Sequence, residues 1–270
     1  MRYPAAAGRY YSDSNSALRN EVERCFLHPL GPGEIPGVIR GPRSIVGAVV
    51  PHASFGASGW VAAHVYHALA RDGFPEAFII IGPNHQGFGS TYSLTSEDFM
   101  TPLGKTRTDV ELVRRLRRWM DDEPFSHQFE HSVEIQLPFI QYMSPETPFV
   151  PILMSLQDYD TAVGLGQAIS EAIQGRDVVV IASSDFSHYV PPEVAKEKDG
   201  AVIDRILDLD IRGVYETVLK RQVSTCGYGP VMAMMEAVHG SSAELLRYGT
   251  SGEVFPSPEV VGYGAIVVRR

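Results

Sequence analysis

The chain has 270 residues, 44% of them hydrophobic, and a formal net charge of −9. This length and apolar content suffice for one large core, so we expect a single domain over residues 1–270. The acidic balance argues against nucleic acid as the main partner, because phosphate binding needs a basic surface. No apolar run approaches the roughly 20 residues that span a bilayer, so a membrane-spanning protein is not expected either.

The cysteine content indicates the compartment. The two cysteines, Cys25 and Cys226, lie far apart in the sequence. A disulfide framework is therefore not expected, and a reducing compartment is the natural setting. The N-terminal segment MRYPAAAGRYYSDS lacks the long apolar core of a signal peptide. We therefore expect a cytoplasmic protein.

The order of predicted elements indicates the fold class. A helical pattern over residues 17–26 is followed by a loop rich in proline and glycine over residues 27–42. The predicted strands cover residues 44–50, 77–82, 149–154, 177–183, 244–249 and 263–269. The predicted helices cover residues 58–70, 110–119, 132–143, 162–174, 202–209, 213–220 and 230–238, with Pro138 expected to kink or start its helix. This alternation predicts an α/β domain with a mostly parallel central sheet and helices on both faces.

Three histidines come just after predicted strands. His52 follows the strand at 44–50, His85 the strand at 77–82, and His188 the strand at 177–183. Ligands in such folds bind beyond the carboxyl ends of the strands, so these side chains meet at one edge if the strands are neighbours. Imidazole is the commonest protein ligand of transition metals and the commonest general base. The alternative is three exposed loop histidines, which leaves their equivalent positions unexplained.

Two further segments contribute candidates. Glu130 and His131 precede an apolar segment and could orient the other imidazoles, whereas Glu134 fits equally well as an acidic residue stabilised by a helix dipole. Cys226 lies in a turn before a predicted helix, where a thiolate is favoured and could bind iron, zinc or copper. A buried, inert cysteine is the alternative reading, and it is the one we favour for Cys25.

Seven segments carry a resemblance to a known family. They are RYPAAAGRYY, VVPHASFGASG, IIIGPNHQGFG, FEHSVEIQLPF, ASSDFSHY, STCGYGP and YGAIVV. In this order they resemble the Memo-like proteins, called the B component of the AmmeMemoRadiSam system in prokaryotes. The segments span almost the whole chain, and together they are specific.

The resemblance implies a fold similar to that of class III extradiol dioxygenases, which are non-haem iron enzymes that open catechol rings. His52 and His85 match the family's two metal-binding histidines. Cys226 matches its cysteine, which stands where the dioxygenases have a glutamate ligand. His188, with Asp185 beside it, matches the histidine that acts as acid and base in the dioxygenases. The resemblance thus implies a metal site with an adjacent catalytic pair.

A thiolate ligand departs from the two histidines and one carboxylate of typical iron oxygenases, and it shifts the site toward softer metals or redox chemistry. The resemblance also links the chain to eukaryotic members that are associated with iron, copper and oxidation chemistry, so one iron or copper ion is expected more than zinc. Asn84, next to His85, and Tyr228, where many relatives have arginine, join Glu130 and His131 as candidates for orienting the ligands or contacting a substrate.

Three functional hypotheses follow. The leading one is a metal-dependent redox enzyme that acts on an unidentified small molecule or peptide. The second is a non-catalytic binding protein that retains a vestigial pocket. The third is a metal-independent cysteine hydrolase that uses Cys226 and His188. The resemblance also implies AMMECR1-domain and radical-SAM proteins as candidate partners.

Overall fold

Four parallel strands form the centre of the sheet in the computed structural model, which describes residues 1–39, 41 and 43–270. In spatial order they are β6 (Phe149–Met154), β2 (Ala77–Pro83), β7 (Val178–Ser183) and β1 (Ile45–Val50). All residues of β2, β6 and β7 are buried, as expected for strands that are covered on both faces. Since β1, β7 and β2 are parallel neighbours, their carboxyl ends meet at the same edge.

Antiparallel strands form both margins of the sheet. β3 (Tyr92–Leu94) pairs with β6, and β10 (Val260–Arg269) pairs with β1. β8 (His188–Val190) and β9 (Ser242–Thr250) both pair with β10. The eight-stranded sheet is therefore mixed, with the predicted parallel arrangement at its centre. The connection from β9 to β10 is too short for a crossover, so these two strands can only be antiparallel.

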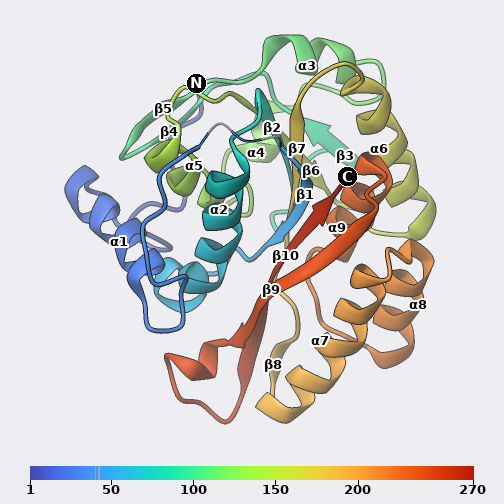
Figure 1. Ribbon diagram of the computed structural model, residues 1–270. Coiled ribbons are helices and arrows are strands. Elements are labelled where there is room, and N and C mark those ends of the chain that lie inside the picture. Colours follow the sequence, from blue (N-terminus) through green and yellow to red (C-terminus); the bar gives the residue numbers. More distant parts are fainter. Residues whose placement is uncertain (40, 42) are drawn as a thin grey trace.

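Helices cover both faces of the sheet, as the sequence predicted (Figure 1). One face carries α1 (Asn15–Leu27), α2 (Trp60–Asp72) and α5 (Leu137–Met143). The other face carries α3 (Val110–Leu116), α6 (Tyr159–Ala172), α7 (Pro192–Leu207), α8 (Ile211–Arg221) and α9 (Tyr228–Val238). The α/β class is thereby confirmed.

The strand β2 shows how one sequence pattern builds two cores. Phe78 and Ile80 pack into the core beneath α1, α2 and α5, whereas Ile79 and Ile81 pack into the core beneath α6 and α9. Successive side chains of a strand point to opposite faces, so a continuous apolar run supplies both layers. Each central strand therefore packs against helices on both faces of the sheet, and this packing fixes the position of its end.

The structure adds elements that the sequence did not predict. They are all short: β3, β8, β4 (Phe99–Thr101), β5 (Gly104–Thr106), α4 (Pro124–His127), the π-helix η1 (Phe55–Gly59) and the 3₁₀-helices η2 (Glu134–Gln136) and η3 (Ser251–Glu253), of which η2 falls inside a predicted α-helix. Such short elements carry too few residues for periodicity to reveal them. The helix predicted over 132–143 divides into η2 and α5, and Pro138 lies in the first turn of α5.

Several boundaries also differ from the prediction, most of all the start of α7, which was expected at residue 202. α7 begins at Pro192, because proline is well suited to the first turn of a helix, where its missing N–H costs nothing. The predicted loop over 27–42 includes the last residue of α1, and Arg40 and Pro42 lie outside the described residues.

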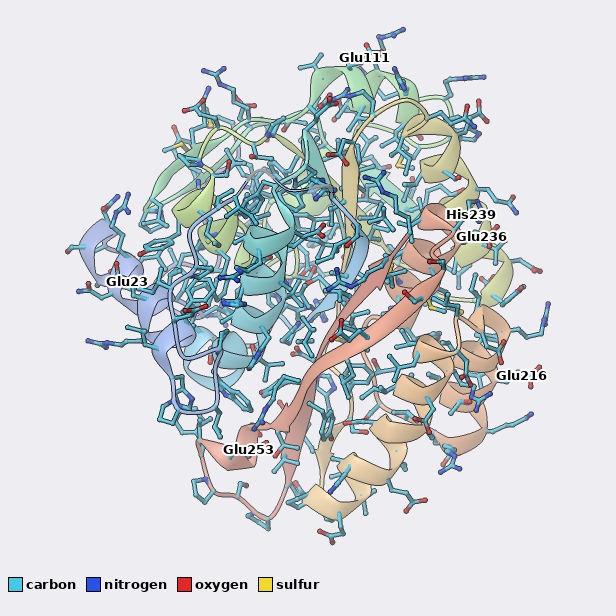
Figure 2. All side chains as sticks on the ribbon, in the orientation of Figure 1. Glu23, Glu111, Glu216, Glu236, His239 and Glu253 are labelled. Carbon is cyan, nitrogen blue, oxygen red and sulfur yellow. The ribbon has the colours of Figure 1, made fainter. Side chains whose placement is uncertain are left out.

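The acidic side chains Glu23, Glu111 and Glu216 lie on the outside of the fold (Figure 2). Within the described part of the chain, no helix has the length and apolarity to span a bilayer.

Candidate metal centre

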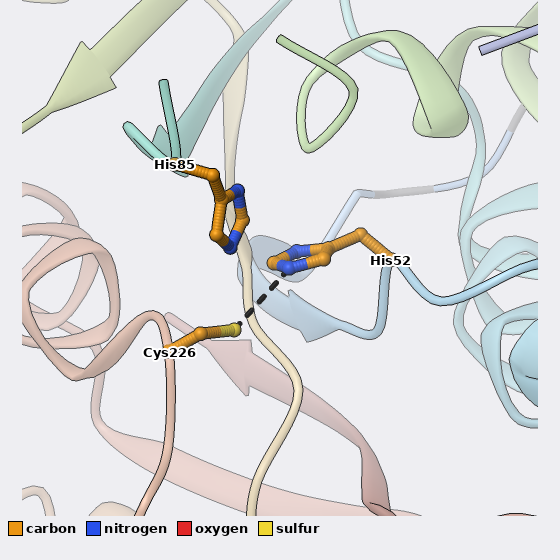
Figure 3. A group of neighbouring side chains, drawn as sticks. All are labelled: His52, His85 and Cys226. Carbon is orange, nitrogen blue, oxygen red and sulfur yellow. Dashed lines mark hydrogen bonds between the residues drawn. The ribbon is translucent and has the colours of Figure 1, made fainter. Parts of the chain in front are cut away.

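The edge at which β1, β2 and β7 end carries the histidines that the sequence singled out. His52 follows β1, His85 follows β2, and His188 begins β8 shortly after β7. Cys226 reaches the same edge from the turn between α8 and α9. Figure 3 shows the rings of His52 and His85 and the sulfur of Cys226 turned toward one another. The structure thus brings together residues that lie up to 174 positions apart in the sequence.

The ligand atoms of His52, His85 and Cys226 lie within 4.8 Å of one another, so this group could hold a metal ion. We call these three residues the metal centre. The His52 Nε2 atom lies 3.2 Å from the Cys226 sulfur. The rings of His52 and His85 are 5.3 Å apart between centroids and nearly perpendicular, at 79°. Two imidazoles and one sulfur therefore surround a common point, with coordination positions left for other ligands.

The tautomer of His52 follows from its hydrogen-bond partners. The Ser183 hydroxyl donates its single proton to the Ser132 carbonyl over 2.6 Å. The same hydroxyl oxygen lies 3.0 Å from His52 Nδ1, so this nitrogen must carry the proton that it donates there. Complete burial, with His131 and His85 nearby, holds the pKa of His52 well below its usual value. The ring is therefore neutral and presents the Nε2 lone pair to the metal centre.

Glu130 fixes His85 in the same way. One carboxylate oxygen lies 3.0 Å from His85 Nδ1, and the other accepts the His85 backbone N–H at 2.6 Å. The carboxylate also accepts backbone N–H groups of His131 and Ser132. Burial alone would raise the pKa of Glu130, but hydrogen bonds from His131 and His85 outweigh it and hold this pKa far below its usual value. An ionised Glu130 keeps the proton on His85 Nδ1 and leaves Nε2 free to bind a metal.

A backbone turn positions Cys226. The Asp185 N–H points at the Cys226 sulfur over 3.3 Å, and the Cys226 N–H donates to the Asp185 carbonyl over 3.3 Å. The next residue, Gly227, packs so tightly that an added Cβ would lie 2.6 Å from the Ser184 side chain. Burial, reinforced by the Asp185 carboxylate, raises the pKa of the Cys226 thiol well above its usual value. A bound cation would favour the thiolate, because a coordinating thiol is deprotonated.

Asp185 and His188 flank the metal centre. The Asp185 carboxylate accepts the His52 backbone N–H at 2.8 Å, and its burial raises its pKa. His188 Nδ1 lies 2.7 Å from the Phe186 carbonyl and 2.7 Å from the Ser224 carbonyl. Since a carbonyl can only accept, Nδ1 carries a proton, and the neutral tautomer therefore has its lone pair on Nε2. His188 also lies near enough to affect the pKa values of His52 and Asp185.

The N-terminal segment holds the loop that carries Glu130, and the sequence patterns did not predict this. The Arg2 Nε atom donates to the His127 carbonyl at 3.0 Å, and Nη2 donates to the Glu130 carbonyl at 2.6 Å. Arg2 also forms a buried ion pair with Glu134. Glu134 additionally accepts the N–H groups of Ala5 and Ala6 and the hydroxyl of Tyr11. Glu134 is therefore an anchor for the N-terminal segment, which neither of its two predicted roles described.

Tyr10 joins the site through stacking. Its ring lies 4.3 Å from that of His131 between centroids, and the His131 ring lies 4.8 Å from that of His85. Both pairs are stacked, at 23° and 24°. His131 Nδ1 also lies 3.2 Å from Glu130. Arg2 and Tyr10 both belong to the segment RYPAAAGRYY, so its place in the family resemblance was the one signal for them.

Asn84 and Tyr228 have local partners in the structure. The Asn84 side chain donates to the Phe88 carbonyl and accepts the N–H groups of Gln86 and Gly87, so it organises the turn that carries His85. Tyr228 begins α9, and its ring lies 6.5 Å from that of Tyr215 between centroids. Neither contact involves a metal-centre side chain.

A second group of suitable atoms comprises His85, Glu130 and His131. Its carboxylate is already saturated by hydrogen bonds from three backbone N–H groups and lies at hydrogen-bond distance from both imidazoles. A carboxylate that binds ring N–H groups orients imidazoles rather than competing for a metal. The donor set of His52, His85 and Cys226, with both Nε2 atoms unprotonated, is the one that fits a metal ion.

Comparisons with known proteins assign the chain to a family. The family model described as Memo-like protein matches residues 2–267, and the chain belongs to this family. It is 46% identical to a MEMO1 family protein of Methanopyrus kandleri, over 100% of this chain and 99% of that protein. A MEMO1 family protein of Methanococcoides burtonii is 43% identical over 100% of both chains.

A solved structure shares the fold. The crystal structure of the uncharacterized protein JW3007 from Escherichia coli K12 matches with a TM-score of 0.55. The match covers 83% of this chain and 99% of that chain, at 12% sequence identity. At this identity the likeness supports the fold alone.

Proposed function

We propose that this member of the Memo-like family is a metal-dependent oxidoreductase whose single iron or copper ion is held by His52, His85 and Cys226. The observation that carries the proposal is how the two imidazoles are protonated and oriented relative to the Cys226 sulfur. Ser183 and Glu130 each keep a proton on the far side of an imidazole, so that both Nε2 lone pairs face the Cys226 sulfur. Such orientation by hydrogen-bonded neighbours is characteristic of metal ligands.

The donor set favours a redox metal. Two imidazoles and a thiolate suit iron, copper and zinc, and a centre with three protein ligands leaves positions for a substrate. We favour iron or copper because the thiolate replaces the carboxylate of typical iron oxygenases, and because the family has been associated with these metals. A bound ion of this kind would supply one-electron chemistry and would lower the pKa of the Cys226 thiol and of a substrate hydroxyl.

Protein residues would handle the proton. The two carbonyls that accept from His188 Nδ1 place the lone pair of the neutral ring on Nε2, so a neutral His188 would be suited to take a proton from a substrate and return it later. Asp185 holds the backbone of His52, contacts Cys226 through its own backbone and lies near enough to His188 for that ring to affect its pKa.

The N-terminal segment and the residues around α4 line a cavity whose size would suit a small molecule or a short peptide, although none of His52, His85, Cys226 and His188 lines it. It measures about 810 Å³ and is lined in part by Arg9, Gln86 and Phe129. Each of these residues adjoins a residue of the site in the sequence, namely Tyr10, His85 or Glu130. Its volume falls in the range of about 300–1,000 Å³ that is typical of ligand sites.

Elemental analysis of protein purified anaerobically without a metal-affinity tag tests the proposal. The native protein is compared with the triple variant His52→Ala, His85→Ala, Cys226→Ala. A matched control removes the same residue types elsewhere, through His67→Ala, His239→Ala and Cys25→Ala. We expect about one equivalent of iron or copper in the native protein and in the control, and none in the triple variant.

Each other outcome points elsewhere. Zinc in place of iron or copper would indicate Lewis-acid or hydrolytic chemistry at the same ligands. No metal in the native protein, even after reconstitution, would overturn the proposal and leave a binding protein or a cysteine hydrolase. The hydrolase would then be inactivated by alkylation of Cys226; the sequence paired this cysteine with His188, but the imidazole nitrogen that lies 3.2 Å from its sulfur is His52 Nε2.

A further inference from the structure

Asp199 is a fully buried carboxylate that is not among the ligands of the metal centre. It lies on α7, and its partners come from two other parts of the fold. The Oδ1 atom accepts both the backbone N–H of Ser187, at 3.0 Å, and the hydroxyl of Ser187, at 2.5 Å. The Oδ2 atom accepts the Tyr248 hydroxyl at 2.8 Å. Burying a carboxylate costs free energy because the group loses its hydration, so we expect Asp199 to have a role that explains why it is buried.

The contact with Ser187 reaches His188 through one peptide group. The N–H of Ser187 and the carbonyl of Phe186 belong to the same planar peptide and point in opposite directions. Asp199 holds the N–H end of this peptide, and His188 Nδ1 donates to the carbonyl end at 2.7 Å. A carboxylate at one end also polarises the peptide, which makes the carbonyl a stronger acceptor at the other end.

The neighbouring peptides have other partners, so this one depends on Asp199. The Phe186 N–H donates to the Gly262 carbonyl, and the Ser187 carbonyl accepts the Gly262 N–H. The His188 N–H donates to the Ser224 hydroxyl. Close packing fixes the carboxylate itself, since a Cβ on Gly262 would lie 1.9 Å from Asp199 Oδ2.

We propose that Asp199 is a positioning residue that acts through the Phe186–Ser187 peptide to hold His188 with its proton on Nδ1 and its Nε2 free. The inference rests on the proposed role of His188 as acid and base. In this arrangement the Asp199 carboxylate contacts the peptide group, and the peptide group contacts the His188 imidazole. The carboxylate and the imidazole do not contact each other directly. Asp199 itself touches neither the metal centre nor His188.

Nitrogen NMR of the full chain tests this arrangement. The histidine ring nitrogens are labelled, the protein is treated with a chelator to avoid paramagnetic broadening, and the His188 signals are assigned with His188→Gln. In the native protein we expect the Nδ1–H tautomer at His188. In Asp199→Leu we expect the ratio of Nδ1–H to Nε2–H forms to fall about three- to tenfold, since one of two acceptors is weakened.

Two further variants separate positioning from general structure. Asp199→Asn keeps an oxygen that can accept from Ser187, so it should restore the native tautomer. Tyr248→Phe removes only the Oδ2 partner and should leave His188 unchanged. The ring signals of His52 and His85, which other residues fix, should stay at their native positions in all folded variants.

The proposal is overturned if native His188 carries its proton on Nε2, or if a folded Asp199→Leu protein keeps the native ratio. Should Asp199→Leu fail to fold, Asp199→Ala, which also removes both acceptor oxygens, takes its place, and an unchanged ratio in that protein overturns the proposal. None of these readouts needs a bound metal, so a failure here is distinct from a failure of the proposed metal centre.

Discussion

Hydrogen-bond donors and acceptors decide which ring nitrogen of each histidine can bind a metal. Ser183 fixes His52 because its own proton is committed to the Ser132 carbonyl, and Glu130 fixes His85 because a carboxylate only accepts. Glu130 combines five polar contacts in one buried side chain, and hydrogen bonds keep it ionised in spite of its burial. The orientation of the metal ligands therefore depends on residues that need not touch the metal.

Glu130→Gln tests this dependence at the scale of one atom. The amide keeps the shape of the carboxylate, but its NH₂ group must face N–H donors at one of the two oxygen positions. We expect metal affinity to fall about 10- to 100-fold, as is typical when a partner of a ligating histidine is replaced. Competition with a chromophoric chelator measures the affinity. The exposed Glu216→Gln serves as the control, and equal affinities in the two variants would contradict the role of Glu130.

At the scale of elements, the first residues of the chain lock the loop between α4 and η2. Arg2 binds one carbonyl at the end of α4 and one in this loop and pairs with Glu134, while Tyr10 stacks on His131. The side chains of Arg2 and Glu134 are 2% and 0% exposed, so neither charge can turn to solvent if its partner is lost. The N-terminal segment is thus part of the site, although it contributes no metal ligand.

A pair of variants checks the Arg2–Glu134 contact. Arg2→Met leaves a buried, unpaired carboxylate, and we expect it to lower the free energy of unfolding by about 3–5 kcal/mol. Adding Glu134→Gln removes that charge but keeps an acceptor for the Tyr11 hydroxyl, so the double variant should be more stable than Arg2→Met alone. Chemical denaturation of the four proteins measures the coupling. Purely additive losses would show that the two side chains do not interact.

At the scale of the whole molecule, buried neutral histidines make stability depend on pH. Burial, with Arg2 nearby, lowers the pKa of His127 from 6.5 to about 3 in the folded protein. Its Nε2 atom has no hydrogen-bond partner among the described residues. Between these two pKa values the unfolded chain binds a proton that the folded chain does not. Stability contributed by a neutral His127 is therefore present above pH 6.5 and is lost as the pH falls toward 3.

Removing the ring should flatten this dependence. In the native protein His127 contributes a slope of up to about 1.4 kcal/mol per pH unit to the free energy of unfolding in this window. We expect His127→Leu to lose that share, as measured by urea denaturation from pH 7 down to about pH 4. His239→Asn is the control, because His239 lies on the surface in the folded protein (Figure 2). Parallel pH profiles for the native and His127→Leu proteins would contradict this assignment.

The sequence by itself determined the α/β class, the central strands and the positions of His52, His85 and His188 at strand ends. Continuous apolar runs reveal strands that are buried on both faces, and parallel strands bring their carboxyl ends to one edge. The resemblance added Cys226 to the ligand set, since a lone cysteine before a helix has no distinctive pattern.

The tertiary structure alone decided the antiparallel margins of the sheet, the ion pair between Arg2 and Glu134, and the tautomers of the three histidines. Arg2 and Glu134 are 132 positions apart, and His52 and Ser183 are 131 apart. Local periodicity reports which face of an element is buried, but it carries no information about which side chain from a distant element will lie opposite. Such pairings are fixed only when the packed chain gives each buried polar group its partner.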